Sequence, residues 1–297
     1  MAQTTFPDLK TKRPRSNLKN WIGVVPFFLF AILFIFLPSM RLFVGAFLNN
    51  EGNFTLANIR DLFTDPYIIN GYSMSIRISA VTAIGGGIFG FLLAYSVTVG
   101  GLPKAIRPVL ITFSGVASNF AGVPLAFAFV ATLGRTGFIT ALVKSIFHVN
   151  LYDVGFSLYS FAGLSLVYMY FQFPLMVLIM APALDGLKRE WREAAENLGA
   201  NTMQYWLRVA FPILLPSILG SMILLFGNAF GAYATAYALV GQGQMQVITI
   251  EIGAQIRGDV MHNPGLGYAM AMGMVFIMAV SLTGYSWLQR KTERWLK

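Results

Sequence analysis

The chain has 297 residues with a formal net charge of +9 at pH 7, and 56% of the residues are hydrophobic whereas 11% are charged. Soluble domains carry roughly 25% charged residues, so the composition excludes an ordinary soluble protein and indicates a membrane protein with room for about six spans of ~20 residues. The absence of cysteine excludes disulfides, thiol catalysis and cysteine-based zinc sites. The two histidines, His148 and His262, are far apart in the sequence, and we expect no metal site.

Residues 1–20 are rich in Lys and Arg and show no apolar periodicity, which predicts a basic cytoplasmic tail. Residues 21–297 are expected to form a single transmembrane domain, with a core at about 70–288. The apolar run 21–37 is too long for a typical signal-peptide core and has no small-residue cleavage site, so it predicts an uncleaved first span. Pro38 is expected to mark a kink or its end.

The polar stretch 49–71 is expected to contain a short amphipathic helix at 55–63 that stops at Asp65-Pro66. The core of the second span follows at 78–99 and is entered through residues 72–77, and its glycines at 85–87 and 90 predict close packing against a neighbouring helix. The fold class is therefore all-α and polytopic, with six transmembrane helices. The remaining four spans are predicted at 108–133, 158–184, 213–240 and 266–288, with a small amphipathic helix at 138–147.

The 21 Lys and Arg residues cluster beside apolar runs. Placing both termini in the cytoplasm puts most of these residues on that side, as the positive-inside rule requires. The charge therefore reflects topology, and we expect no nucleic-acid partner. The same topology places the loop at 185–212, between spans 4 and 5, in the cytoplasm.

The 185–212 loop is predicted to form two short helices. Ion pairs four residues apart, Arg189 with Glu193 and Arg192 with Glu196, support the first. Gly199 is expected to end it in a left-handed conformation, and Asn201 or Thr202 to cap a second helix at 203–209. One apolar stripe of the first helix is predicted to contain Leu187, Trp191, Ala194, Ala195 and Leu198.

The sequence Glu193-Ala194-Ala195, followed by Gly199, Val209 and Phe211-Pro212, resembles the EAA loop, or coupling helix, of permease subunits from bacterial binding-protein-dependent ABC importers. Phe211 stands where the family pattern has Leu. From about Asn70 to the C-terminus the chain is similar to the type I permease core. The segments at 65–67, 228–237 and 251–259 resemble, loosely, the polyamine, ferric-iron, thiamine and phosphonate branch.

This resemblance implies an inner-membrane subunit that performs no chemistry and transports a polyamine or another small polar solute. Its partners are two cytoplasmic ATPase subunits, which bind the ATP and Mg, a second identical or homologous permease, and an extracytoplasmic binding protein. The chain has no P-loop and is expected to bind no cofactor itself. By analogy, Glu193 makes a polar contact with an ATPase, Ala194 and Ala195 allow close approach, and Gly199 fixes the turn. In the last outer segment, Glu251, Arg257, Asp259 and His262 either form part of the docking surface for the binding protein or are solvated loop charges.

The predicted spans contain no Asp or Glu, which counts against the alternative, an ion-driven secondary transporter or a channel without an ATPase. An enzyme is disfavoured because the spans also lack clusters of histidine, carboxylate and cysteine. Polar residues in the spans either line a translocation path or bind neighbouring helices to one another. The candidates for the path are Ser118, Asn119, Tyr168, Gln172, Asn228, Tyr233 and Tyr237.

Overall fold

The computed structural model describes residues 23–293, except 102, 104, 242, 244 and 258–261, and describes side chains as far as residue 287. The predicted tail at 1–20 lies outside this part of the chain. Within it the secondary structure is helical, apart from one isolated bridge between Leu48 and Phe54. The predicted all-α class is confirmed. Six segments are long and apolar enough to cross a membrane: Val25–Gly45, Pro66–Thr98, Val123–Phe147, Phe161–Asp185, Thr202–Phe230 and Pro264–Trp287.

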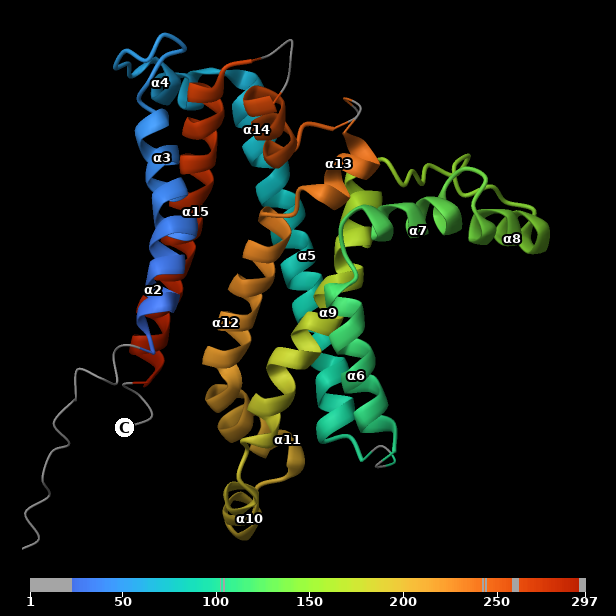
Figure 1. Cartoon of the computed structure of the whole chain (residues 1–297). Coiled ribbons are helices and arrows are strands. Elements are labelled where there is room, and N and C mark those ends of the chain that lie inside the picture. Colours follow the sequence, from blue (N-terminus) through green and yellow to red (C-terminus); the bar gives the residue numbers. More distant parts are fainter. Residues whose placement is uncertain are drawn as a thin grey trace, which may run out of the picture.

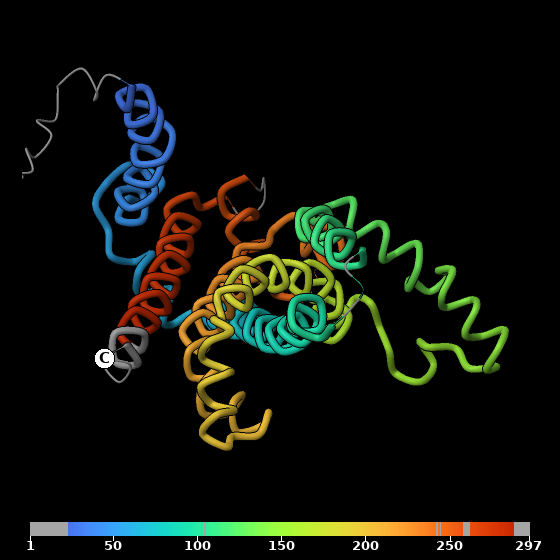
Figure 2. Tube along the Cα trace, turned by 90° about the horizontal axis from the view of Figure 1, so that it is seen from below, coloured from blue at the N-terminus to red at the C-terminus, as the bar shows by residue number. Residues whose placement is uncertain are grey.

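Two long helices, α5 (Pro66–Thr98) and α9 (Phe161–Asp185), pack against each other at the centre of the bundle, as Figures 1 and 2 show. The helices α6 (Ile106–Asn119) and α12 (Phe211–Phe230) pack against this pair. To one side, α15 (Pro264–Glu293) packs against α3 (Leu37–Gly45). We call the end of the bundle with α4 (Ala57–Thr64) and α14 (Ile248–Arg257) the α4 end, and the end with α10 (Arg189–Asn197) the α10 end.

Glycines allow the two central helices to approach closely. A Cβ atom on Gly90 would lie 2.5 Å from Met176 Cβ, and one on Gly86 would lie 2.6 Å from Gln172 Cβ. Real Cβ atoms do not approach each other so closely, so α5 and α9 contact at a distance that only glycine permits. The packing role predicted for the glycines at 85–87 and 90 agrees with this arrangement.

The first span is longer than predicted, because Pro38 does not end it. The helix runs from α2 (Val25–Ala31) through a π-helical turn, η1 (Ile32–Phe36), into α3, which ends at Gly45. A proline ring clashes with the carbonyl four residues before it. A π turn places an extra residue in the helix and relieves such crowding, so the chain passes Pro38 without stopping.

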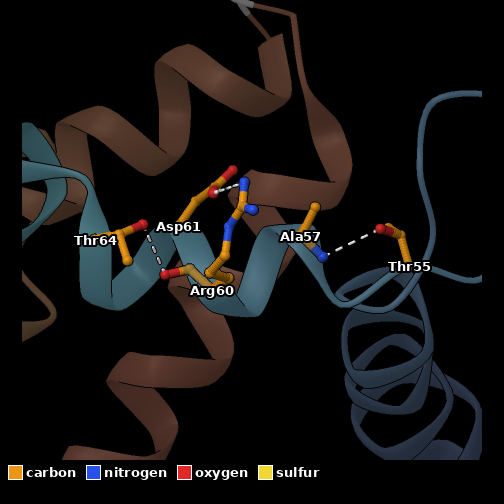
Figure 3. A network of polar contacts seen from close by, with 5 residues as sticks. All are labelled: Thr55, Ala57, Arg60, Asp61 and Thr64. Carbon is orange, nitrogen blue, oxygen red and sulfur yellow. Dashed lines mark hydrogen bonds and ion pairs between the residues drawn. The ribbon is translucent and has the colours of Figure 1, made fainter.

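The second span also begins earlier than predicted, at Pro66. The Asp65 side chain accepts a hydrogen bond from the Tyr67 N–H at 2.8 Å, and Pro66 occupies the first helical turn. Asp65-Pro66 therefore ends α4 and starts α5, which has 33 residues and includes Arg77. In α4, the Thr64 hydroxyl donates to the Arg60 carbonyl at 3.1 Å and Arg60 pairs with Asp61 at 3.4 Å (Figure 3).

The third predicted span, 108–133, is wrong as one helix. It breaks at residues 120–122 into α6 and α7 (Val123–Leu133). Gly122 has φ +76° and ψ −150°, a conformation open essentially to glycine alone. Figure 1 shows α7 and α8 (Phe138–Phe147) running across the direction of α6, which lies along α9. By length and composition the third candidate span is Val123–Phe147.

The fifth predicted span, 213–240, is wrong at both ends. It breaks at residues 231–233 and resumes as the short helix α13 (Ala234–Val240). At its start, α11 (Thr202–Tyr205) continues through a π-helical turn, η2 (Trp206–Ala210), directly into α12. The fourth and sixth spans are confirmed with small shifts of their ends.

Candidate functional site

The 185–212 loop has the local geometry that its sequence predicts. The Arg189 Nε lies 2.7 Å from Glu193 Oε1, and Arg192 Nε lies 2.9 Å from Glu196 Oε1. Gly199 adopts φ +82°, which glycine adopts without the steric cost that a Cβ atom brings. This residue therefore turns the chain between α10 and α11.

A capping box starts α11. The Gln204 N–H donates to Asn201 Oδ1 at 2.8 Å, and the Asn201 N–H donates to Gln204 Oε1 at 2.9 Å. Of the two predicted caps, Asn201 is the one that the structure shows. These reciprocal bonds satisfy two otherwise unpaired N–H groups and fix the direction in which the chain leaves the turn.

A small apolar cluster fastens this loop to the bundle. Ala195, Tyr205 and Ala210 are buried, and Leu187 and Trp191 pack against them. The Trp206 ring meets the Tyr95 ring of α5 edge to face, with 4.9 Å between centroids. Because α11 and η2 continue into α12, the loop has no flexible joint on that side, and the predicted end of the second helix at Val209 is wrong.

The predicted apolar stripe is only partly buried. Ala194 is exposed and Leu198 is 89% exposed; the two lie four residues apart, on a face of α10 that the described part of the chain does not cover. Met203 and Leu207 are exposed as well. The loop thus presents apolar side chains between charged ones at its tip, as a surface that binds another protein does. Of the remaining motif residues, Val209 is half-buried, Phe211 is exposed and Pro212 lies in the first turn of α12.

The two helix breaks meet inside the bundle. The Gly122 N–H donates to Thr235 Oγ1 at 2.8 Å, and the same hydroxyl donates to the Gly122 carbonyl at 3.3 Å. At the other break, the Ala232 carbonyl accepts from the Tyr168 hydroxyl at 2.9 Å and from the Thr249 hydroxyl at 3.4 Å. We call this set of contacts the break junction. It joins α6, α7, α9, α13 and α14 through backbone groups that regular helices would have paired.

Five of the seven path candidates lie near the break junction. They are Ser118, Asn119, Asn228, Tyr233 and Tyr237, which flank the two breaks. Asn119, Asn228 and Tyr237 are exposed. The rings of Tyr233 and Tyr237 stack with 5.4 Å between centroids, and the Arg257 guanidinium lies 5.3 Å from the Tyr233 ring centre.

The other two candidates, Tyr168 and Gln172, are buried in α9 and bind α12 or the chain just after it. The Gln172 amide donates to the Leu225 carbonyl at 2.8 Å, while its oxygen has no hydrogen-bond partner among the described residues. These contacts are of the kind that hold membrane helices together.

The residues expected to form the docking surface differ in their exposure. Glu251 is buried and accepts a hydrogen bond from the Tyr67 hydroxyl at 2.8 Å, so it is not part of an exposed surface. Burial raises the pKa of the Glu251 carboxyl above its usual value, and the bond from Tyr67 opposes this increase. Arg257 and His262 are exposed, whereas Asp259 lies outside the described residues.

Sequence reasoning missed two residues. Gly122 was not a candidate, although Asn119 and Gly122 repeat the spacing of Asn228 and Gly231 at the second break. Arg77 is predicted only as part of the entry to the second span, and the structure places it well inside α5. A lone basic residue followed by a long apolar run was the available signal for it.

A family model described as the binding-protein-dependent transport system inner membrane component matches residues 20–296. The chain belongs to this family. Its members are permease subunits of ABC importers, so the predicted family and the non-enzymatic role are both confirmed. The permease is an integral membrane subunit of such an importer. Its membership of the family implies that it works together with the other subunits of an importer of this kind.

Three relatives illustrate the range of this family. A probable sulfate transport system permease protein CysT of Helicosporidium sp. subsp. Simulium jonesii is 28% identical over 73% of this permease and 75% of the relative. The spermidine/putrescine permease PotB of Haemophilus influenzae is 26% identical over 94% and 98%. The putative ferric permease FbpB 1 of the same organism is 23% identical over 89% of this permease, which spans 40% of that relative. Polyamine and iron relatives agree with the predicted branch, and sulfate relatives extend it.

Among solved structures, a chain of a bacterial ABC transporter involved in the import of the acidic polysaccharide alginate has a TM-score of 0.71. It is 17% identical, and the match covers 94% of this permease and 96% of that chain. The likeness shows a shared fold.

We expect Thr235→Val to loosen the break junction. Valine has a similar volume but removes both bonds to Gly122, whose part-buried N–H then loses its partner at a cost of roughly 1 kcal/mol. The Tm of the purified permease should fall by a few degrees, at about 2–4 °C per kcal/mol, measured by differential scanning fluorimetry. Thr235→Ser retains the hydroxyl and should behave like the unaltered chain. An equal loss in both variants would mean that packing, not hydrogen bonding, holds the junction.

Proposed function

We propose that the permease forms one half of a solute path and is driven by two cytoplasmic ATPase subunits, which contact its 185–212 loop. In this proposal both termini are cytoplasmic, the α10 end faces the cytoplasm, and a binding protein delivers solute at the α4 end. A second permease, identical or homologous, forms the other half of the path. The observation that carries the proposal is the exposed tip of α10, which packs through Ala195 against α11 and η2, and these two run directly into α12.

The 185–212 loop combines an accessible tip with a rigid base, as is needed to transmit the movement of a bound ATPase. At its tip, the side chain of Glu193 is about half exposed although it pairs with Arg189. Such an exposed pair contributes little to stability, and the carboxylate remains accessible to a partner. The buried cluster around Ala195 and Tyr205 makes the loop stiff, so a displacement of α10 reaches α12 rather than being absorbed.

The break junction suits a path for a small polar solute. Exposed amides and phenol groups at Asn119, Asn228 and Tyr237 lie beside backbone that is not helical. Irregular backbone within a membrane protein is tolerated where it lines a cavity or is buried in protein. Tyr168 and Gln172 then hold the helices that carry the path, while the exposed residues contact the solute.

The rival function, ion-driven transport without an ATPase, has less support. Within the six candidate spans the only carboxylate is Asp185, at the α10 end of α9, where it pairs with Arg107. Proton and sodium transporters use carboxylates inside the membrane, and this pair lies at the end of the span. Its position fits an ion pair that stabilises the helix end.

The experiment compares Glu193→Gln with Glu190→Gln, a control in the first turn of the same helix. Permease with its co-purified ATPase is reconstituted into nanodiscs. We expect Glu193→Gln to retain basal ATP hydrolysis and to lose about tenfold or more of the stimulation by loaded binding protein, since one charged contact is worth about 1.5–3 kcal/mol. The control should match the unaltered chain. Absence of any co-purifying ATPase, or equal effects of both variants, would contradict the proposal.

A further inference from the structure

Arg77 is an unpaired cation in an otherwise apolar helix. The ion pairs among the described residues do not include it, and its side chain is exposed. Residues 78–98 of α5 follow it without a charged residue, and about 20 helical residues span the ~30 Å hydrocarbon layer. Arg77 thus lies where α5 enters the membrane at the α4 end. A charge at this position requires water or an anionic partner.

Arg77 lines an open pocket of about 660 Å³. One wall is a stripe of α5, in which Asn70, Ser73 and Arg77 are spaced by three and four residues and share one helix face. The other walls are the start of α9 and the chain between α13 and α14. We call this the Arg77 pocket; Tyr159 and Gln246 line it on these other walls.

The lining has the chemistry of an anion site. Arg77 supplies the only charge among the described lining residues, and Asn70, Ser73 and Gln246 add groups that can donate hydrogen bonds. A guanidinium binds carboxylate, sulfate and phosphate oxygens with paired hydrogen bonds. A cation in the same pocket would meet no carboxylate among the described lining residues.

The Arg77 pocket lies next to the proposed path. Tyr159 lines it and also lines a second pocket, which contains Phe127 and Tyr237. Tyr237 stacks on Tyr233 at the break junction. A lipid headgroup would stay at the membrane surface, whereas a transported solute would move on from the Arg77 pocket toward the breaks. The position of the pocket beside the path therefore favours a solute as its ligand.

We propose that the Arg77 pocket is an entry site for an oxyanion group, a sulfate, phosphate or carboxylate, on the transported solute. This inference rests on the proposed function, because it takes the α4 end as the side where solute arrives. It narrows the small polar solute to an anionic one and so argues against a polyamine. Arg77 holds the negative group at the mouth of the path, and Asn70, Ser73 and Gln246 add hydrogen bonds to it.

The chain has no cysteine, so Ser73→Cys introduces a single thiol beside Arg77. In the assembled transporter in phosphatidylcholine nanodiscs, we measure the rates at which this thiol reacts with an anionic and with a cationic methanethiosulfonate reagent. We expect the anionic reagent to be favoured by about tenfold, because a nearby cation concentrates anions. Arg77→Gln should remove this preference and Arg77→Lys should keep most of it. Arg60→Gln, on α4 at the same end of the bundle, is the control and should change nothing.

The ligand that protects the thiol from the reagent then shows whether a solute anion, a lipid or a cation occupies the pocket. Sodium sulfate should slow the reaction several-fold relative to sodium chloride of equal ionic strength, and Arg77→Gln should abolish this protection. Protection by added phosphatidylglycerol but not by sulfate would overturn the proposal in favour of a lipid site. Protection by spermidine instead would overturn it in favour of a cationic solute. These measurements need no ATP hydrolysis, so their failure is distinct from failure of the ATPase coupling tested with Glu193.

Discussion

Gly199→Val is expected to reduce the amount of ATPase recovered with the permease by about tenfold. The residue has φ +82°, and a residue with a Cβ atom in this conformation costs roughly 1–2 kcal/mol, most of all when it is β-branched. Relief of that strain requires the turn between α10 and α11 to change direction, which moves the proposed docking surface. About 1.4 kcal/mol corresponds to a factor of ten in binding. Quantitative co-purification of the two subunits measures it.

Gly155→Val is the matched control for this variant. Gly155 also has a positive φ, +94°, and neither glycine has an atom within 4 Å of the position that a Cβ would take. Gly155 lies between α8 and α9, away from the 185–212 loop. Equal loss of ATPase in both variants would show a general effect on folding, and full recovery with Gly199→Val would remove the turn from the coupling mechanism.

Gly90→Ala is expected to reduce the folded permease in membranes several-fold. The added Cβ would lie 2.5 Å from Met176 Cβ and 2.9 Å from the Phe173 carbonyl oxygen. Because the second atom belongs to the backbone, α5 and α9 must separate, and overpacking of this kind costs roughly 1–3 kcal/mol or more. Size-exclusion chromatography of a fluorescent fusion measures the folded fraction.

Gly284→Ala provides the comparison within another long helix. A Cβ at Gly284, in α15, would have no neighbour within 4 Å, and alanine favours a helix over glycine by about 1 kcal/mol. This variant should match or exceed the unaltered chain. If Gly90→Ala behaves in the same way, the close contact of α5 with α9 is not needed for folding.

Much of the local structure of the 185–212 loop could be predicted from sequence because it depends on residues close together in the chain. The ion pairs of Arg189 and Arg192, the turn at Gly199 and the cap at Asn201 are all set within a few residues. Burial was less predictable. Ala194 and Leu198 belong to the apolar stripe but are exposed, because an apolar pattern does not distinguish a face that packs within the chain from one left open on the surface.

The helix breaks could not be predicted because tertiary contacts stabilise them. The apolar runs 108–133 and 213–240 each look like one span, and nothing in either run alone requires a break. The break after Asn119 is stabilised by Thr235, more than a hundred residues away. The backbone groups freed at each break find partners only in the folded bundle. For the same reason, the sequence indicated polar residues in the spans but not which of them bind neighbouring helices.

The π-helical turn η2 sets the rotational phase between the 185–212 loop and the fifth span. A π turn contains one more residue than the α-helical turn it replaces, and one residue corresponds to about 100° of rotation about the helix axis. The direction in which α10 points around the bundle therefore depends on the turn at Trp206–Ala210. Deletion of one residue that restored a regular α-helical turn here would rotate α10 by about 100° relative to α12, so the direction in which the permease presents α10 depends on a single residue of helix length.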